Sequence, residues 1–157
     1  MASYDIRYDF GTTNEQDIIA AINDLNAGKD TTINIYHNGG GNARLAIDLS
    51  SAILSSSAQC IKICVIGYAG SAAAFVVMSC QLYAAPNVIM TIPEPCMIMY
   101  HRPRIDNNMT GLEYFDLPSS TCMEYDRLMH DWLKMYPTSY NNMKAYYSNH
   151  EYVFITR

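Results

Sequence analysis

The sequence predicts an α/β fold in which helices connect the strands of a mostly parallel sheet. Strand-like and helix-like segments alternate along most of the chain, and strand-like segments begin near residues 31, 60 and 88. A separation of roughly 30 residues is typical of a strand–helix–strand unit. Residues 72–83 are Ala-rich and apolar on nearly every face, which indicates a helix buried against such a sheet.

The N-terminal elements are indicated by capping residues and by hydrophobic period. Thr13 and Gln16 have the spacing of a capping box and precede apolar residues at helical spacing, which predicts a helix that ends at Gly28. The β-branched and aromatic residues 31–37 predict a strand. This strand leads into a run of glycines, and residues 42–57 then predict a second helix.

The middle of the chain alternates short apolar runs with small or polar residues. Residues 60–66 predict a strand, and the small residues 67–71 predict a tight turn into the buried helix. Two further strands are expected over residues 88–92 and 96–100, with prolines between them. The polar residues 102–117 are expected to form a loop.

The C-terminal elements are a helix over residues 119–135, a last helix over 138–148 and a strand over 152–156. No linker or low-complexity segment interrupts the chain, so we expect residues 1–157 to form a single domain.

The charge and composition exclude some classes of partner. The 157 residues include 10 basic and 15 acidic side chains, giving a formal net charge of −5, and no run of Lys or Arg occurs. Because binding to nucleic acid depends on clustered cations, this class of partner is disfavoured. Charged residues make up only 16% and hydrophobic residues 50%, which suits a homo-oligomer that buries surface against its own copies.

The cysteines and the N-terminus indicate a cytoplasmic or similar reducing compartment. The cysteines are Cys60, Cys64, Cys80, Cys96 and Cys122. Their number is odd, they form no C-x-x-C pair, and no Cys/His cluster has the spacing of metal ligands, so neither disulfides nor a metal is expected. Residues 1–10 lack the apolar region of a signal peptide, and the longest apolar stretch is too short to span a membrane.

Ser71 is the strongest candidate for a nucleophile. It lies where a buried strand is expected to meet a buried helix, among small residues that allow a sharp turn. The pattern is related to the G-x-S-x-G elbow, with Ala69 and Ala73 in place of both glycines. Taken alone, a serine that caps an Ala-rich helix is more often structural.

His101 is the best-placed base. It follows the strand-like residues 96–100, at the edge of a parallel sheet where catalytic groups gather. Taken alone, a histidine at the end of a strand more often bonds a loop. His37 adjoins the glycine run, whereas His130 and His150 lie in polar surroundings typical of a solvated surface.

The run Gly39, Gly40 and Gly41 follows a strand and opens a helix. Such a loop exposes backbone N–H groups and allows a substrate to come close. It fits neither the G-x-G-x-x-G nor the G-x-x-x-x-G-K-[ST] nucleotide motif, so no nucleotide cofactor is expected. An oxyanion hole or a clamp for a peptide backbone is the better use of this loop.

The order of these pieces resembles the proteolytic subunit of the ATP-dependent Clp protease, a serine peptidase family. The family's nucleophile segment is G-x-A-x-S-x-[AG]-x-[FL], and it is matched by Gly67, Ala69, Ser71, Ala73 and Phe75. Residues 99–103 are similar to its histidine segment [IM]-H-[QR]-P, and residues 37–41 stand in place of its N-S-P-G-G segment. The resemblance covers residues 17–103 and continues through a helical handle region at about residues 104–136.

The resemblance implies a Clp/crotonase-type fold of repeated ββα and βα units and a serine endopeptidase that cleaves unfolded polypeptides. Ser71 would attack the peptide carbonyl, His101 would accept its proton, and Ala72 with Gly39 or Gly40 would hold the oxyanion. It also implies homo-oligomers in two stacked seven-membered rings, fed by an AAA+ unfoldase, with no cofactor.

Two departures from the family pattern concern the third catalytic group and the C-terminus. Tyr152 stands where the family has the triad Asp, and Glu151 is one residue earlier. Loss of the orienting acid can lower kcat by ~10⁴. If Glu151 orients His101, Glu151→Gln should lower hydrolysis by about tenfold or more. The family usually continues past the position of Arg157 with a helix-and-strand tail.

Alternative functions remain open from the sequence. The chain could be a catalytically weakened or inactive structural subunit of a mixed ring, with Tyr152 marking the decayed triad. It could instead be a Ser/Lys protease of the phage or signal-peptide-peptidase type, although Lys62, Lys134 and Lys144 are not next to a glycine or a helix-start signal. A CoA hydratase or isomerase of the same fold would not require a serine elbow.

Overall fold

A computed structural model describes residues 1–107, 112–115, 120–135 and 151–156, and its core is a mostly parallel sheet. Within these residues the sheet has six strands in the order β1-β2-β3-β5-β8, with β4 also paired to β3. Their bounds are β1 (Ala2–Arg7), β2 (Thr31–Asn38), β3 (Ile61–Gly70), β4 (Val88–Thr91), β5 (Met97–Tyr100) and β8 (Tyr152–Ile155). Only β8 runs antiparallel, against β5. The predicted α/β architecture with a mostly parallel sheet is therefore confirmed.

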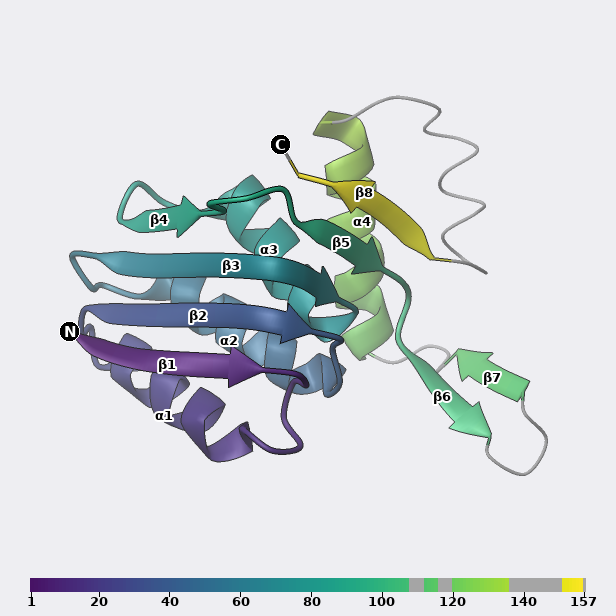
Figure 1. Ribbon diagram of the computed structural model, residues 1–157, viewed down its shortest axis with the longest axis horizontal. Coiled ribbons are helices and arrows are strands. Elements are labelled where there is room, and N and C mark those ends of the chain that lie inside the picture. Colours follow the sequence, from purple (N-terminus) through teal and green to yellow (C-terminus); the bar gives the residue numbers. More distant parts are fainter. Residues whose placement is uncertain (108–111, 116–119, 136–150, 157) are drawn as a thin grey trace.

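The described helices cover one face of this sheet. They are α1 (Glu15–Asn26), α2 (Ala43–Ser55), α3 (Ala72–Tyr83) and α4 (Ser120–Met135), and Figure 1 shows them behind the strands, with α4 behind β5 and β8. Right-handed crossovers between parallel strands place successive helices on the same side. Residues 72–80 of α3 are all buried, which confirms the prediction of a buried helix.

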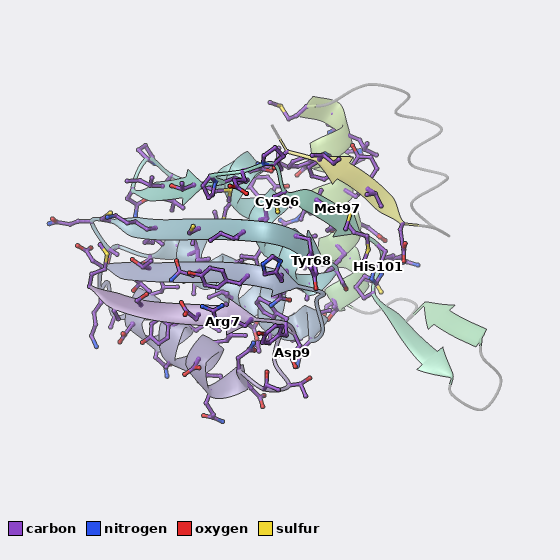
Figure 2. The ribbon with its side chains drawn as sticks, viewed as in Figure 1. Arg7, Asp9, Tyr68, Cys96, Met97 and His101 are labelled. Carbon is purple, nitrogen blue, oxygen red and sulfur yellow. The ribbon has the colours of Figure 1, made fainter. Side chains whose placement is uncertain are left out.

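The opposite face of the sheet is not covered by any described helix, and we call it the open face. Along β2 the side chains alternate, with Ile33 and Ile35 buried against the helices and Asn34 partly exposed on the open face. Toward β5 and β8 the open face becomes apolar. Tyr68, Met97 and Ile155 are cross-strand neighbours there and are 37%, 46% and 65% exposed. Figure 2 shows Tyr68 and Met97 in front of the strands.

The start of α1 differs from the predicted capping box. The helix begins at Glu15, and Thr13 donates its hydroxyl to Asp9 rather than capping the helix. Asn14 is buried, and its side chain accepts from the Gly11 N–H at 2.9 Å. The loop before the helix is thus held by side-chain bonds that compete with the predicted cap.

Two segments have more strand than the sequence predicts. The expected turn over residues 67–71 is too long, because β3 continues to Gly70 and pairs with β5 beyond a register shift opposite Tyr36 and Asn38, and the chain turns only at Ser71. Gly67, at φ +85°, accommodates this irregularity. The expected loop over residues 102–117 contains a hairpin of β6 (Arg104–Asn107) and β7 (Leu112–Phe115).

The other predicted elements agree with the structure to within a few residues. β1 was not predicted, although its Ile6 is buried while its charged neighbours Asp5 and Arg7 are exposed, the alternation typical of a half-buried strand. The predicted helix over residues 138–148 lies outside the described residues.

Candidate active site

Backbone strain marks one edge of the sheet. Among the described residues that are not glycine, only Tyr8, His37 and Ser71 have positive φ angles, of 68°, 43° and 51°. They lie at or just beyond the carboxyl ends of β1, β2 and β3, which are neighbours in the sheet. Strained backbone of this kind tends to cluster at functional sites, and this is the edge where parallel α/β sheets hold their ligands.

Ser71 occupies a sharp turn between β3 and α3. Its φ and ψ are 51° and −115°, and its N–H donates to the Met99 carbonyl at 2.7 Å, which ties the turn to β5. The side chain is partly exposed, whereas Gly70 and Ala72 on either side are buried. A strained strand-to-helix turn that presents a serine is the geometry of a nucleophile elbow.

The glycine loop packs directly on this turn. A Cβ added at Gly40 would lie 2.4 Å from the Ser71 Cβ and 3.0 Å from the Ala72 nitrogen, and Gly40 has a φ of +99°. Only glycine fits there. A Cβ at Gly39 would instead meet just the Tyr8 carbonyl, at 3.7 Å. The loop therefore approaches Ser71 and the start of α3 through Gly40.

The loop amides differ in what they bind. Gly39 N–H donates to the Tyr8 carbonyl at 3.0 Å, and Gly40 N–H donates to the Asn38 side chain at 2.9 Å. The two glycine amides that are predicted as alternative partners of Ala72 in the oxyanion hole thus both have acceptors within the chain. Within the described residues, the Gly41 amide has no acceptor. The Ala72 amide begins α3, where no carbonyl of the helix can accept from it.

Asn38 is a contributor that sequence reasoning passed over. It is fully buried at the end of β2, and its side chain accepts from Gly40 while donating to the Asp9 carbonyl. An Asn just before glycines commonly bonds its own backbone two residues on, so the sequence held a signal for this role.

His101 leaves β5 at the same edge at which Ser71 leaves β3. Gly70 is paired with Met99, so both residues lie just past a registered pair on adjacent strands. Figure 2 places His101 at that end of the sheet. Its Nδ1 lies 2.8 Å from the Arg102 carbonyl oxygen. Because a carbonyl only accepts, this bond requires a proton on Nδ1 and leaves Nε2 as the basic nitrogen in the neutral ring.

Glu151 comes just before β8, the antiparallel neighbour of β5. Tyr100 pairs with Tyr152, so one further step along the register sets Glu151 opposite His101. Glu151 is exposed. Tyr152, at the position of the family's Asp, packs its ring 5.4 Å from that of Phe154.

Of the remaining histidines, the structure describes His37 and His130. His37 lies over Gly67, where an added Cβ would fall 2.1 Å from the His37 Nδ1, and its ring is 5.7 Å from that of Tyr68. His130 is on α4 beside Asp131, with 3.5 Å between Nδ1 and the carboxylate. His150 lies outside the described residues.

Among the residues that the structure describes, no three His, Cys, Asp or Glu side chains are grouped so that they could ligate a metal ion. None of the described helices combines the length and the apolar character that a membrane span requires.

Comparison with known proteins finds similarity in structure but not in sequence. No family model matches the chain, and no curated protein matches it. A solved structure of a ClpP1 mutant from Listeria monocytogenes superposes with a TM-score of 0.58 at 13% sequence identity, covering 97% of this chain and 81% of that one. The chain therefore has a Clp/crotonase-type fold, which it shares with this ClpP1 structure.

Proposed function

We propose that the protein is a serine endopeptidase of the Clp type, with Ser71 as nucleophile and His101 as general base. One observation carries the proposal. Ser71 lies in a strained elbow, and its N–H donates to the Met99 carbonyl of β5. Met99 is two residues before His101, which follows this strand. A structural helix cap would not require that strain.

The proposed reaction is acyl transfer in two steps. The Ser71 Oγ attacks the carbonyl of a peptide bond while His101 Nε2 takes the hydroxyl proton, and that proton then passes to the leaving amine. A water molecule, deprotonated by His101, next attacks the acyl-enzyme. The carboxyl product leaves and the Ser71 hydroxyl regains its proton.

The oxyanion would be held by two main-chain amides. Ala72 N–H is one, at the start of α3. We assign the second to Gly41 because the amides of Gly39 and Gly40 already have acceptors. In this assignment Gly40 allows the loop to pack closely on Ser71, and the N–H of the next residue, Gly41, is the hydrogen-bond donor.

Glu151 takes an electrostatic role in this proposal. The register sets it opposite His101, where its negative charge favours the imidazolium that forms during reaction. Because Glu151 is exposed, water and salt weaken this effect.

We also propose that the subunit assembles with copies of itself through the open face. The row Tyr68, Met97 and Ile155 exposes apolar side chains together, and contiguous patches of this kind mark interaction surfaces. By the resemblance described above, the assembly would be stacked rings, with residues 104–136 as the handle. Such a chamber would receive unfolded polypeptides from an AAA+ partner.

Labelling of the nucleophile tests the function. The purified protein is incubated with a fluorophosphonate, and its intact mass is measured. An adduct of one equivalent that is absent from Ser71→Ala supports the peptidase. An assembled particle without any adduct supports the alternative of a non-catalytic ring subunit, which Tyr152 at the acid position favours.

A further inference from the structure

An ion pair ties the residue after His101 to α4. The Arg102 guanidinium donates from Nε to one oxygen of the Asp126 carboxylate at 3.1 Å, and a second guanidinium nitrogen lies 3.1 Å from the other oxygen. This two-pronged geometry fixes orientation as well as distance. The Arg102 side chain is only 17% exposed and the Asp126 side chain is 43% exposed, so the pair is shielded from solvent mainly on the Arg102 side.

The residues on both sides of His101 are held by the same helix. Tyr100 is fully buried and donates its hydroxyl to the Tyr125 carbonyl at 2.7 Å. Its ring also stacks on the Tyr125 ring at 5.6 Å between centroids. On the other side, the Pro103 carbonyl accepts from the Cys122 thiol at 3.7 Å. One face of α4 therefore holds the backbone before and after the histidine.

We propose that Asp126 is a positioning residue for His101, acting through Arg102, and that the Arg102 main-chain carbonyl takes the place of the triad carboxylate at Nδ1. The proposal rests on the proposed function, since it assigns a means of orienting the general base. The carbonyl lies 2.8 Å from Nδ1, and the direction in which it points depends on the backbone at Arg102. Asp126 anchors that residue by its side chain.

The residue after Arg102 adds to this constraint. Pro103 restricts the residue before it to extended backbone conformations, which leaves the Arg102 carbonyl few other directions. A neutral carbonyl selects the tautomer in which Nε2 can accept the Ser71 proton, as a carboxylate does, but it adds no negative charge. This is how a site with Tyr152 at the family's acid position can keep a correctly oriented base.

The experiment measures the tautomer and the reaction rate separately. Protein labelled with ¹⁵N-histidine is examined by NMR, with the His101 signals assigned from His101→Gln, and fluorophosphonate labelling is timed on the same samples. In the wild type we expect His101 to carry its proton on Nδ1. In Asp126→Asn we expect a mixture of both tautomers and labelling slower by about tenfold or more.

Matched variants separate positioning from general damage to the helix. Glu124→Gln removes the exposed pair with Arg127 on the same helix, and we expect an unchanged tautomer and rate. Asp126→Glu keeps the charge and should recover most of the wild-type behaviour. The double variant Arg102→Asp with Asp126→Arg forms an ion pair with the charges exchanged and keeps the main-chain carbonyl. Its labelling rate and its fraction of the Nδ1–H tautomer should therefore exceed those of either single variant.

The possible results distinguish this proposal from the proposed function. If the wild type is not labelled, the peptidase assignment fails, whereas the tautomers of wild type and Asp126→Asn still decide the positioning role. An Asp126→Asn variant that folds and keeps the Nδ1–H tautomer at the wild-type rate overturns the proposal. If Asp126→Asn does not fold, Arg102→Lys serves instead, because it keeps the positive charge but loses the two-pronged geometry. A wild-type tautomer and a wild-type labelling rate in Arg102→Lys would then overturn the positioning proposal.

Discussion

Ser71 combines a reactive position with an unfavourable backbone conformation. At φ 51° and ψ −115° a residue with a Cβ is strained, and glycine is not. We therefore predict that Ser71→Gly is more stable than Ser71→Ala by about 1 kcal/mol, although both lack the proposed nucleophile. Chemical denaturation of the two variants measures this difference. Equal stability, or a less stable glycine variant, would show that the elbow holds no strain.

Gly40 and Gly39 offer a matched pair at the site. Alanine at Gly40 would place a Cβ 2.4 Å from the Ser71 Cβ at a φ of +99°, whereas alanine at Gly39 meets nothing nearer than 3.7 Å. We predict that Gly40→Ala slows fluorophosphonate labelling by about 100-fold, since small misplacements at a reacting centre have effects of this size. Gly39→Ala should stay within about threefold of wild type. Comparable losses in both variants would contradict the close approach of Gly40.

A substitution of Glu151 tests which group accepts the hydrogen bond from the Nδ1–H of His101. With Nδ1 bonded to the Arg102 carbonyl, our proposal gives Glu151 an effect only through its exposed charge. We predict that Glu151→Gln lowers peptide hydrolysis by less than about tenfold, and that the loss shrinks as salt is added. Steady-state rates at low and high ionic strength provide the check. A larger loss that salt does not change would return the triad role to Glu151.

At the scale of elements, the features that the sequence predicts are those that depend on hydrophobic periodicity and local residue composition. The apolar residues of α3 predict a buried helix, and the β-branched residues of β2 predict a strand. Both predictions succeed because the positions that an element buries are the positions at which its sequence is apolar. The small residues around Ser71 likewise indicated the elbow. The sequence predicts a loop where β6 and β7 form a hairpin, because the segment is polar and contains residues that favour turns, namely Pro103, Asn107, Asn108 and Gly111.

The features that the sequence did not reveal depend on contacts between distant segments. The amide of Gly39 is engaged by Tyr8, and the carboxylate of Asp126 reaches Arg102 across 24 residues of sequence. No periodicity encodes such pairs. Local pattern therefore predicts candidate residues for the site, whereas the tertiary structure decides which of their polar groups can still bind a substrate.

At the scale of the whole molecule, the open face should govern assembly. A charge at Met97 would lie among the apolar side chains of Tyr68 and Ile155. We predict that Met97→Glu folds, because Met97 is 46% exposed, but yields particles of lower mass than the wild type. Gln16→Glu, on the exposed side of α1, is the control that should assemble normally. Sedimentation velocity measures both, and wild-type mass in Met97→Glu would exclude this face as a contact.

The central claim is that Ser71 and His101 act together at one edge of the sheet. Its most direct measurement is the rate and the position of fluorophosphonate modification, mapped by peptide mass spectrometry in the wild type and in His101→Ala. We predict modification at Ser71 in the wild type and a rate lower by at least about 100-fold in His101→Ala. Modification at another residue, or an equal rate without the imidazole, would contradict the account.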